Sequence, residues 1–192
     1  MDSKGEQYSN ESILKGIIHH SKFDGGFFGG GSGGFIGKGK RAEVIKSLGF
    51  SDRPTQGECW SKMQTVRLEA YPGHSVTVHK DLVQEVQDIY KELKELGVEL
   101  NDYQGSYCYR PIRNPNHPST TLSMHSFGCA LDLNYNLNPF KENTGPLSSG
   151  DDTRHGVVRT VNSPIVQVFA KYGWGWGGRY GDYMHFSKAN GG

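Results

Sequence analysis

Two short segments carry the residues that could do chemistry in this chain of 192 residues. In the first, His125 and Asp132 are spaced as H-x6-D within a stretch of otherwise small or apolar residues. In the second, Asp182 and His185 are spaced as D-x-x-H in a glycine- and aromatic-rich stretch. Each pair alone also fits a capped turn or a structural histidine, so neither pair by itself identifies a site.

Together the two pairs supply two imidazoles and two carboxylates. Two histidines and one carboxylate are a known ligand set of catalytic zinc, with the fourth position left to water. The remaining carboxylate is then free to accept a proton from that water, while the metal polarises a carbonyl. These residue types therefore indicate a zinc hydrolase, and they leave open which carboxylate binds the metal.

Strands and turns must bring the two pairs together. Large apolar side chains alternate with small ones over 127–135, which predicts a strand that carries Asp132, preceded by a turn at Ser126. Asp182 is expected in a glycine-rich turn, with His185 on the strand that follows it. Shorter strands are expected at 76–78, 106–110 and 183–187.

Helices are expected to cover this sheet. Over 80–96 apolar residues recur at i, i+3, i+4 and i+7, and Gly97 provides a stop. A second helix is expected over 164–172, with Pro164 in its first turn, and a short one over 41–50. Runs of strands with helices on one side predict an α+β fold around an antiparallel central sheet.

Composition argues against several other classes of function. The net charge of +1 provides no excess of positive charge for a nucleic acid, so we expect no such partner. The mean hydropathy of −0.62 and the absence of a long apolar run predict no membrane span and no signal peptide. The three cysteines, an odd number, predict free thiols rather than a disulfide framework.

Glycine content divides the chain into two parts. Nine of the fifteen residues over 25–39 are glycine, and such a segment loses too much backbone entropy on folding to order by itself. We expect residues 1–50 to form an N-terminal arm that contains this glycine-rich linker. Residues 51–192 are expected to form the catalytic domain.

The two pairs also lie in recognisable motifs. The stretch Ser123–Asp132 reads SMHSFGCALD and matches the pattern S-x-H-x-x-G-x-A-x-D. This pattern resembles that of the D-alanyl-D-alanine carboxypeptidase family of zinc peptidases, which includes phage L-alanyl-D-glutamate endopeptidase endolysins. The later pattern W-G-G-x-x-x-D-x-x-H-F is matched over 176–186, and Tyr109–Arg113 resembles the arginine-bearing strand and loop of the family. The resemblance covers about residues 60–187.

This resemblance implies a hedgehog/DD-peptidase-like fold and a role for each matched residue. It implies one zinc ion bound by His125, Asp132 and His185, with Asp182 as the general base. Arg110 would stabilise the developing oxyanion, although Arg113 is an alternative for that role. Three further residues are implied in substrate binding: Ser123, Trp174 and Trp176.

The function implied by the resemblance is hydrolysis of peptide bonds next to a D-amino acid in peptidoglycan stem peptides. We expect a monomeric phage endolysin or virion-associated lysin. It would stay in the host cytoplasm until a holin releases it, or travel in the virion. The alternative is a structural virion component that binds the cell wall with little or no activity. The bond that is cut remains open between L-Ala–D-Glu, D-Ala–D-Ala and cross-bridge bonds.

Overall fold

The computed structural model describes residues 40–113, 119–141 and 150–189. All of the described residues belong to one compact unit. The predicted glycine-rich linker over 25–39 lies outside the described residues.

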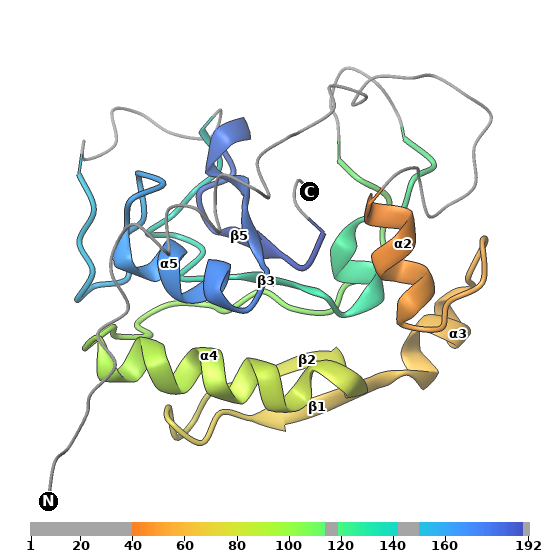
Figure 1. The fold of residues 1–192 in the computed structure, drawn as a ribbon, viewed down its shortest axis with the longest axis horizontal. Helices are drawn as coiled ribbons and strands as arrows, with labels where there is room; N and C mark the ends of the chain where they lie inside the picture. The colour runs from red at the N-terminus through yellow and green to blue at the C-terminus, as the bar shows by residue number, and fades with distance from the viewer. Residues whose placement is uncertain (1–39, 114–118, 142–149, 190–192) are drawn as a thin grey trace, which may run out of the picture. The chain divides into compact units, whose positions relative to one another are not determined.

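Helices account for the most regular part of the structure (Figure 1). Their bounds are α2 Lys40–Ser47, α3 Gln56–Ser61, α4 Val83–Glu95 and α5 Pro164–Lys171, with shorter 3-10 turns η1 Lys80–Leu82, η2 Met124–Phe127 and η4 Gly177–Tyr180. The three helices predicted from the sequence are therefore confirmed.

The strands form two small antiparallel sheets, which confirms the α+β fold class. The first sheet pairs β1 (Met63–Arg67) with β2 (Ser75–His79). The second has the order β3-β5-β4, in which β5 (His185–Ser187) lies between β3 (Ala130–Asp132) and β4 (Gly175–Trp176). The predicted central sheet is thus short and consists of segments that are far apart in the sequence.

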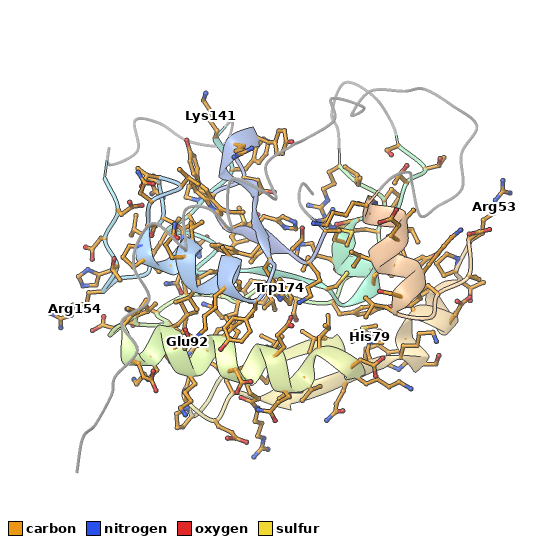
Figure 2. The ribbon with its side chains drawn as sticks, in the orientation of Figure 1. Arg53, His79, Glu92, Lys141, Arg154 and Trp174 are labelled. Atoms are coloured by element: carbon orange, nitrogen blue, oxygen red, sulfur yellow. The ribbon has the colours of Figure 1, made fainter. Side chains whose placement is uncertain are left out.

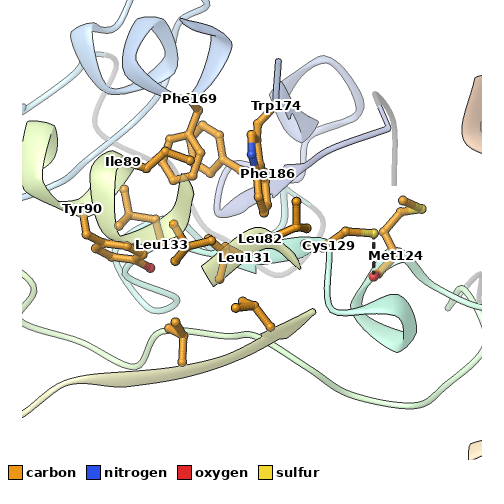
Figure 3. Close-up of a cluster of buried hydrophobic side chains, with 14 of the residues drawn as sticks. Leu82, Ile89, Tyr90, Met124, Cys129, Leu131, Leu133, Phe169, Trp174 and Phe186 are labelled. Carbon is orange, nitrogen blue, oxygen red and sulfur yellow. Dashed lines mark hydrogen bonds between the residues drawn. The ribbon is translucent and has the colours of Figure 1, made fainter. Parts of the chain in front are cut away.

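A single hydrophobic core connects the helices to both sheets. Phe169 of α5 stacks on Phe186 of β5, with ring centroids 3.9 Å apart (Figure 3). Gln87 binds helix α4 to the end of β1, because its side-chain amide donates to the carbonyl of Arg67 and accepts from the N–H of Glu69. The stacking of Phe169 on Phe186 thus joins α5 to the second sheet, and the hydrogen bonds of Gln87 join α4 to the first sheet.

The N-terminal helix α2 also contributes to this core. Ile45 is fully buried and Phe50 nearly so, and both belong to the same cluster as the residues of α4 and α5. The packed unit thus includes residues that we assigned to the N-terminal arm over 1–50. The catalytic range that we predicted, 51–192, omits this part of the packing.

The strand predicted over 127–135 is largely wrong. The structure has the turn η2 up to Phe127, then Gly128 with a left-handed backbone (φ +63°), and only Ala130–Asp132 as a strand. The alternation of large and small residues misleads here because both faces are buried, Ala130 as completely as Leu131. The predicted strand over 106–110 is likewise not a regular strand, although Gly105 pairs with Asp132 through an isolated bridge.

Two smaller expectations can also be compared with the structure. All three cysteines are free; Cys59 and Cys129 are buried and Cys108 is exposed. Within the described ranges, no helix has the length and apolar character required to cross a bilayer.

Candidate metal centre

The turn η2 presents His125 to the site. Its N-cap is Ser123, whose hydroxyl accepts a hydrogen bond from the His125 N–H at 3.4 Å. Its C-cap is Gly128, where a Cβ atom would lie 2.4 Å from the backbone nitrogen of His79. Any larger residue at this position would collide with β2, so the glycine of the motif has a steric reason.

The ring of His125 is oriented by a backbone carbonyl. Its Nδ1 lies 2.6 Å from the carbonyl oxygen of Ser106, which can only accept a hydrogen bond. Nδ1 therefore carries the proton, and Nε2 keeps its lone pair free for a ligand. Fixing of the tautomer by a hydrogen bond at the second ring nitrogen is typical of metal-binding histidines.

Asp132 and His185 are placed opposite each other by the second sheet. They are direct partners in the antiparallel pairing of β3 with β5, so their side chains emerge from the same face. The carboxylate of Asp132 lies against Gly105, where a Cβ atom would be only 2.6 Å from Oδ2. The lack of a side chain at Gly105 thus makes room for the carboxylate.

Three potential ligand atoms meet at one point. His125 Nε2 lies 3.1 Å from His185 Nδ1, and Asp132 Oδ1 lies 3.2 Å from each of these nitrogens. Bonds of about 2.0–2.1 Å in a tetrahedral zinc site place neighbouring ligand atoms about 3.3–3.4 Å apart. The triangle therefore has nearly the size of one face of such a tetrahedron, and the donor set of two imidazoles and one carboxylate also fits zinc.

The charges of these groups support the same interpretation. Burial acts to raise the pKa of Asp132, but the charges and hydrogen bonds of His125 and His185 outweigh it and hold the pKa well below its usual range. Burial acts to lower the pKa of His185, but Asp132 and Asp182 raise it above its usual value. The cluster thus stabilises a positive charge beside Asp132, which a divalent cation would also provide.

Asp182 lies beside the cluster, in the turn that precedes β5. Its carbonyl accepts the N–H of His185 at 3.3 Å, and it pairs with Phe140 through an isolated bridge. Burial raises the pKa of Asp182. The charges of His185, His125 and Arg110 act to lower it, and the charge of Asp132 acts to raise it. The turn followed by a strand that we predicted for Asp182 and His185 is confirmed.

Arg110 is the arginine that acts electrostatically on the site. Its charge affects both Asp182 and His185, whereas Arg113 is exposed in the chain that follows. The backbone of Arg110 is tied to η2 at two points: its N–H donates to Ser126 Oγ at 2.9 Å, and its carbonyl accepts the N–H of Ser123 at 2.9 Å.

The three residues implied in substrate binding have different surroundings. Trp174, labelled in Figure 2, is only 3% exposed. It packs against Phe169 (Figure 3) and donates its indole N–H to Glu85, so core packing accounts for its position. Trp176 is half-buried and donates to the carbonyl of Tyr183. Ser123 is buried and caps η2, as described above. A role in substrate binding stays a prediction for all three.

Sequence reasoning missed the importance of Ser126. Its hydroxyl is fully buried and reaches the carbonyls of Cys108 and Arg110 at 3.2 and 2.9 Å, besides accepting from the N–H of Arg110. It therefore connects the segment of Arg110 to the turn of His125. Its place beside His125 in the motif was the only available signal, because the contacts join positions 16 and 18 residues apart.

The triangle of potential metal ligands, with a further carboxylate beside it, has the groups that a metal-dependent hydrolase needs. Residues 117–188, which contain all four groups, match the family model described as D-alanyl-D-alanine carboxypeptidase. This match confirms the family resemblance drawn from the motifs, and together with the cluster it identifies the class as a metallopeptidase. The comparison with curated proteins gave no match, and neither did the comparison with solved structures.

Proposed function

We propose that this protein is a zinc-dependent peptidase that hydrolyses peptide bonds next to a D-amino acid in peptidoglycan stem peptides. The observation that carries the proposal is the triangle of His125 Nε2, Asp132 Oδ1 and His185 Nδ1, with sides of 3.1–3.2 Å. The family match over the same residues supports the peptide substrate.

A zinc ion bound by these three residues would polarise the scissile carbonyl and acidify a water molecule. Asp182 accepts the proton of the attacking water and later delivers it to the leaving amine, as a general base and acid. Its burial suits this role, because a raised pKa makes the carboxylate a stronger base than an exposed aspartate. Arg110 donates a hydrogen bond to the carbonyl oxygen as negative charge develops there.

We further propose that the protein acts as a phage lysin, either released from the host cytoplasm through a holin or carried in the virion. The support is the motif resemblance to L-alanyl-D-glutamate endopeptidase endolysins. Expression in host cells with and without a holin tests the first route. Lysis that needs the holin supports it, and lysis of equal speed without a holin contradicts it.

The catalytic proposal is tested on purified cell walls. We expect the zinc-loaded protein to release soluble fragments and Asp182→Ala to release none, and mass spectrometry of the fragments will identify the bond that is cut. Release of single D-Ala residues would indicate a carboxypeptidase, and new D-Glu amino termini an endopeptidase. If both proteins bind walls equally and neither cuts, the protein is a wall-binding module and the proposal fails.

A further inference from the structure

Arg41 lies on helix α2, far from the site in sequence, yet it contacts the turn that carries His125. Its guanidinium Nη2 donates a hydrogen bond to the carbonyl of Leu122. Its Cζ also lies 6.0 Å from the centroid of the Phe127 ring, within the range of a cation–π contact. One side chain therefore contacts both Leu122, which lies before the turn, and Phe127, which ends it.

The two residues that Arg41 contacts lie at opposite ends of η2. Leu122 directly precedes the N-cap Ser123, and Phe127 is the last residue of the turn. A 3-10 turn of four residues has poor internal hydrogen bonding, so its geometry depends on what surrounds it. The position of His125 within the turn therefore depends on contacts such as those of Arg41.

The same carbonyl lies next to the segment of Arg110. Leu122 pairs with Pro111 through an isolated bridge, and the N–H of Ser123 donates to the carbonyl of Arg110. A shift of Leu122 would thus move the cap of His125 and the backbone of Arg110 together. Arg41 is connected in this way to a ligand of the metal and to the residue proposed to bind the oxyanion.

Helix α2 holds Arg41 firmly in place. Ile45, one turn further along α2, is fully buried in the core, and Ala42 and Val44 pack against the same core. Figure 1 shows α2 beside the turn that precedes β3. Burial lowers the pKa of Arg41 to about 10, which still leaves the guanidinium charged at neutral pH.

We propose that Arg41 is a positioning residue of the metal centre: it fixes the turn of His125 and, through Leu122, the backbone of Arg110. This inference rests on the proposed function, and it goes beyond the family match, which covers only residues 117–188. It gives a residue of α2, which lies outside the matched region, a role in positioning the site.

The test uses two substitutions of Arg41 in the full chain. Arg41→Met keeps an unbranched side chain but removes the guanidinium, with its hydrogen bond to Leu122 and its contact with the Phe127 ring, whereas Arg41→Lys keeps a positive charge and a donor nitrogen. Leu93→Ala is the control, because it destabilises the same core from helix α4, which carries none of the proposed site residues. Zinc affinity is measured by competition with a chromogenic chelator, and kcat and KM are measured on a defined stem peptide.

We expect Arg41→Met to lose about 10–100-fold in zinc affinity or in kcat, the usual cost of removing an outer-shell partner, with a smaller change in KM. Arg41→Lys should recover part of this loss. Leu93→Ala should lower the melting temperature at least as much as Arg41→Met but keep the zinc affinity and kcat of the unaltered chain.

Three results would overturn the inference, and only the last of them also overturns the proposed function. If the unaltered chain binds zinc and cleaves, and Arg41→Met does both equally well, Arg41 has only a structural role and the proposed function stands. Losses of the same size in Leu93→Ala would lead to the same conclusion. If the unaltered chain neither binds zinc nor cleaves, the proposed function fails, and the positioning role fails with it.

Discussion

Two buried regions of this protein are stabilised in different ways. The region of β1, β2 and α4 consists of five-residue strands and a thirteen-residue helix whose buried residues are mostly apolar. The region of η2, β3 and β5 consists of elements of three or four residues, and two of its buried polar side chains, His125 and Ser126, bind backbone groups of a neighbouring segment. The first provides a rigid support, and the second places chemical groups on it.

The difference shows why a catalytic centre can be held by such short elements. Asn138, in the turn that follows β3, shows the same kind of bonding: it is fully buried, its amide donates to the carbonyls of Leu133 and Gly156, and its oxygen accepts from Val158 and Arg159. Directional bonds of this kind specify geometry, whereas apolar packing contributes stability without direction. If this comparison is correct, substitutions in the two regions should affect different measurements.

The largest effect is expected at Asp182. Asp182→Asn removes the proton acceptor without removing a proposed metal ligand, so kcat should fall by about 10²–10⁴-fold. Zinc content and melting temperature should stay close to those of the unaltered chain. Steady-state kinetics on a stem peptide and metal analysis of the same sample provide the check. Loss of zinc in this variant would mean that Asp182 is a ligand.

A large effect on stability alone is expected in α4. Leu93 is fully buried, and Leu93→Ala should reduce the free energy of unfolding by about 2–5 kcal/mol through the cavity it leaves. The kcat of the remaining folded protein should be unchanged. Urea unfolding and kinetics well below the melting temperature measure the two quantities. A loss of kcat in the folded protein would show that packing around α4 also determines the geometry of the site.

A smaller effect is expected at Asn134, which has a positive φ of 45°. Its side chain donates to the carbonyls of Glu99 and His155 and accepts from Gln104. Asn134→Ala should cost about 1–3 kcal/mol, because it leaves buried polar groups unpaired and keeps the unfavourable backbone angle. Asn134→Gly, which tolerates this angle, should cost less. A glycine variant as stable as the unaltered chain would show that the hydrogen bonds contribute nothing.

The last and smallest effect concerns the pH dependence of stability without metal. The pKa of Asp132 is held below its ordinary value of 3.8, so its contribution is complete above about that pH and is lost as the pH falls further. The pKa of His185 is raised above 6.5, so its contribution is complete below that value and is lost as the pH rises through the raised pKa. The chelated protein should thus be most stable at mildly acidic pH.

Thermal unfolding of the chelated protein between pH 3 and pH 9 tests this dependence, with His185→Gln as the comparison. The substitution should remove the decline on the alkaline side. A chelated protein that gains stability from pH 6 to pH 9 would contradict the charge assignment in the cluster.

The regular region could be predicted from the sequence, and the polar region only in part. Helix α4 followed from its apolar spacing, because one of its faces meets the core and the other meets water. The strand over 127–135 was wrong because burial on both faces removes the contrast on which such spacing depends. In this region the informative signal was the set of potential metal ligands, His125, Asp132 and His185, and not the pattern of hydrophobicity.

The contacts that hold the site could not be predicted at all. Arg41 and Leu122 are 81 positions apart, and nothing in the local sequence of either residue indicates the other. Ser126 binds the backbone of Arg110, and a serine in a turn carries no sign of which distant carbonyl it will reach. Such contacts depend on the completed fold, so the sequence revealed the chemical groups but not the residues that position them.

The most direct test of the metal centre is the amount of zinc per chain, measured by native mass spectrometry after reconstitution and removal of excess metal. The account predicts one zinc ion in the unaltered chain and in Asp182→Asn, and none in His125→Ala or His185→Ala. One zinc ion retained by His185→Ala at full affinity, or none bound by the unaltered chain, would contradict it.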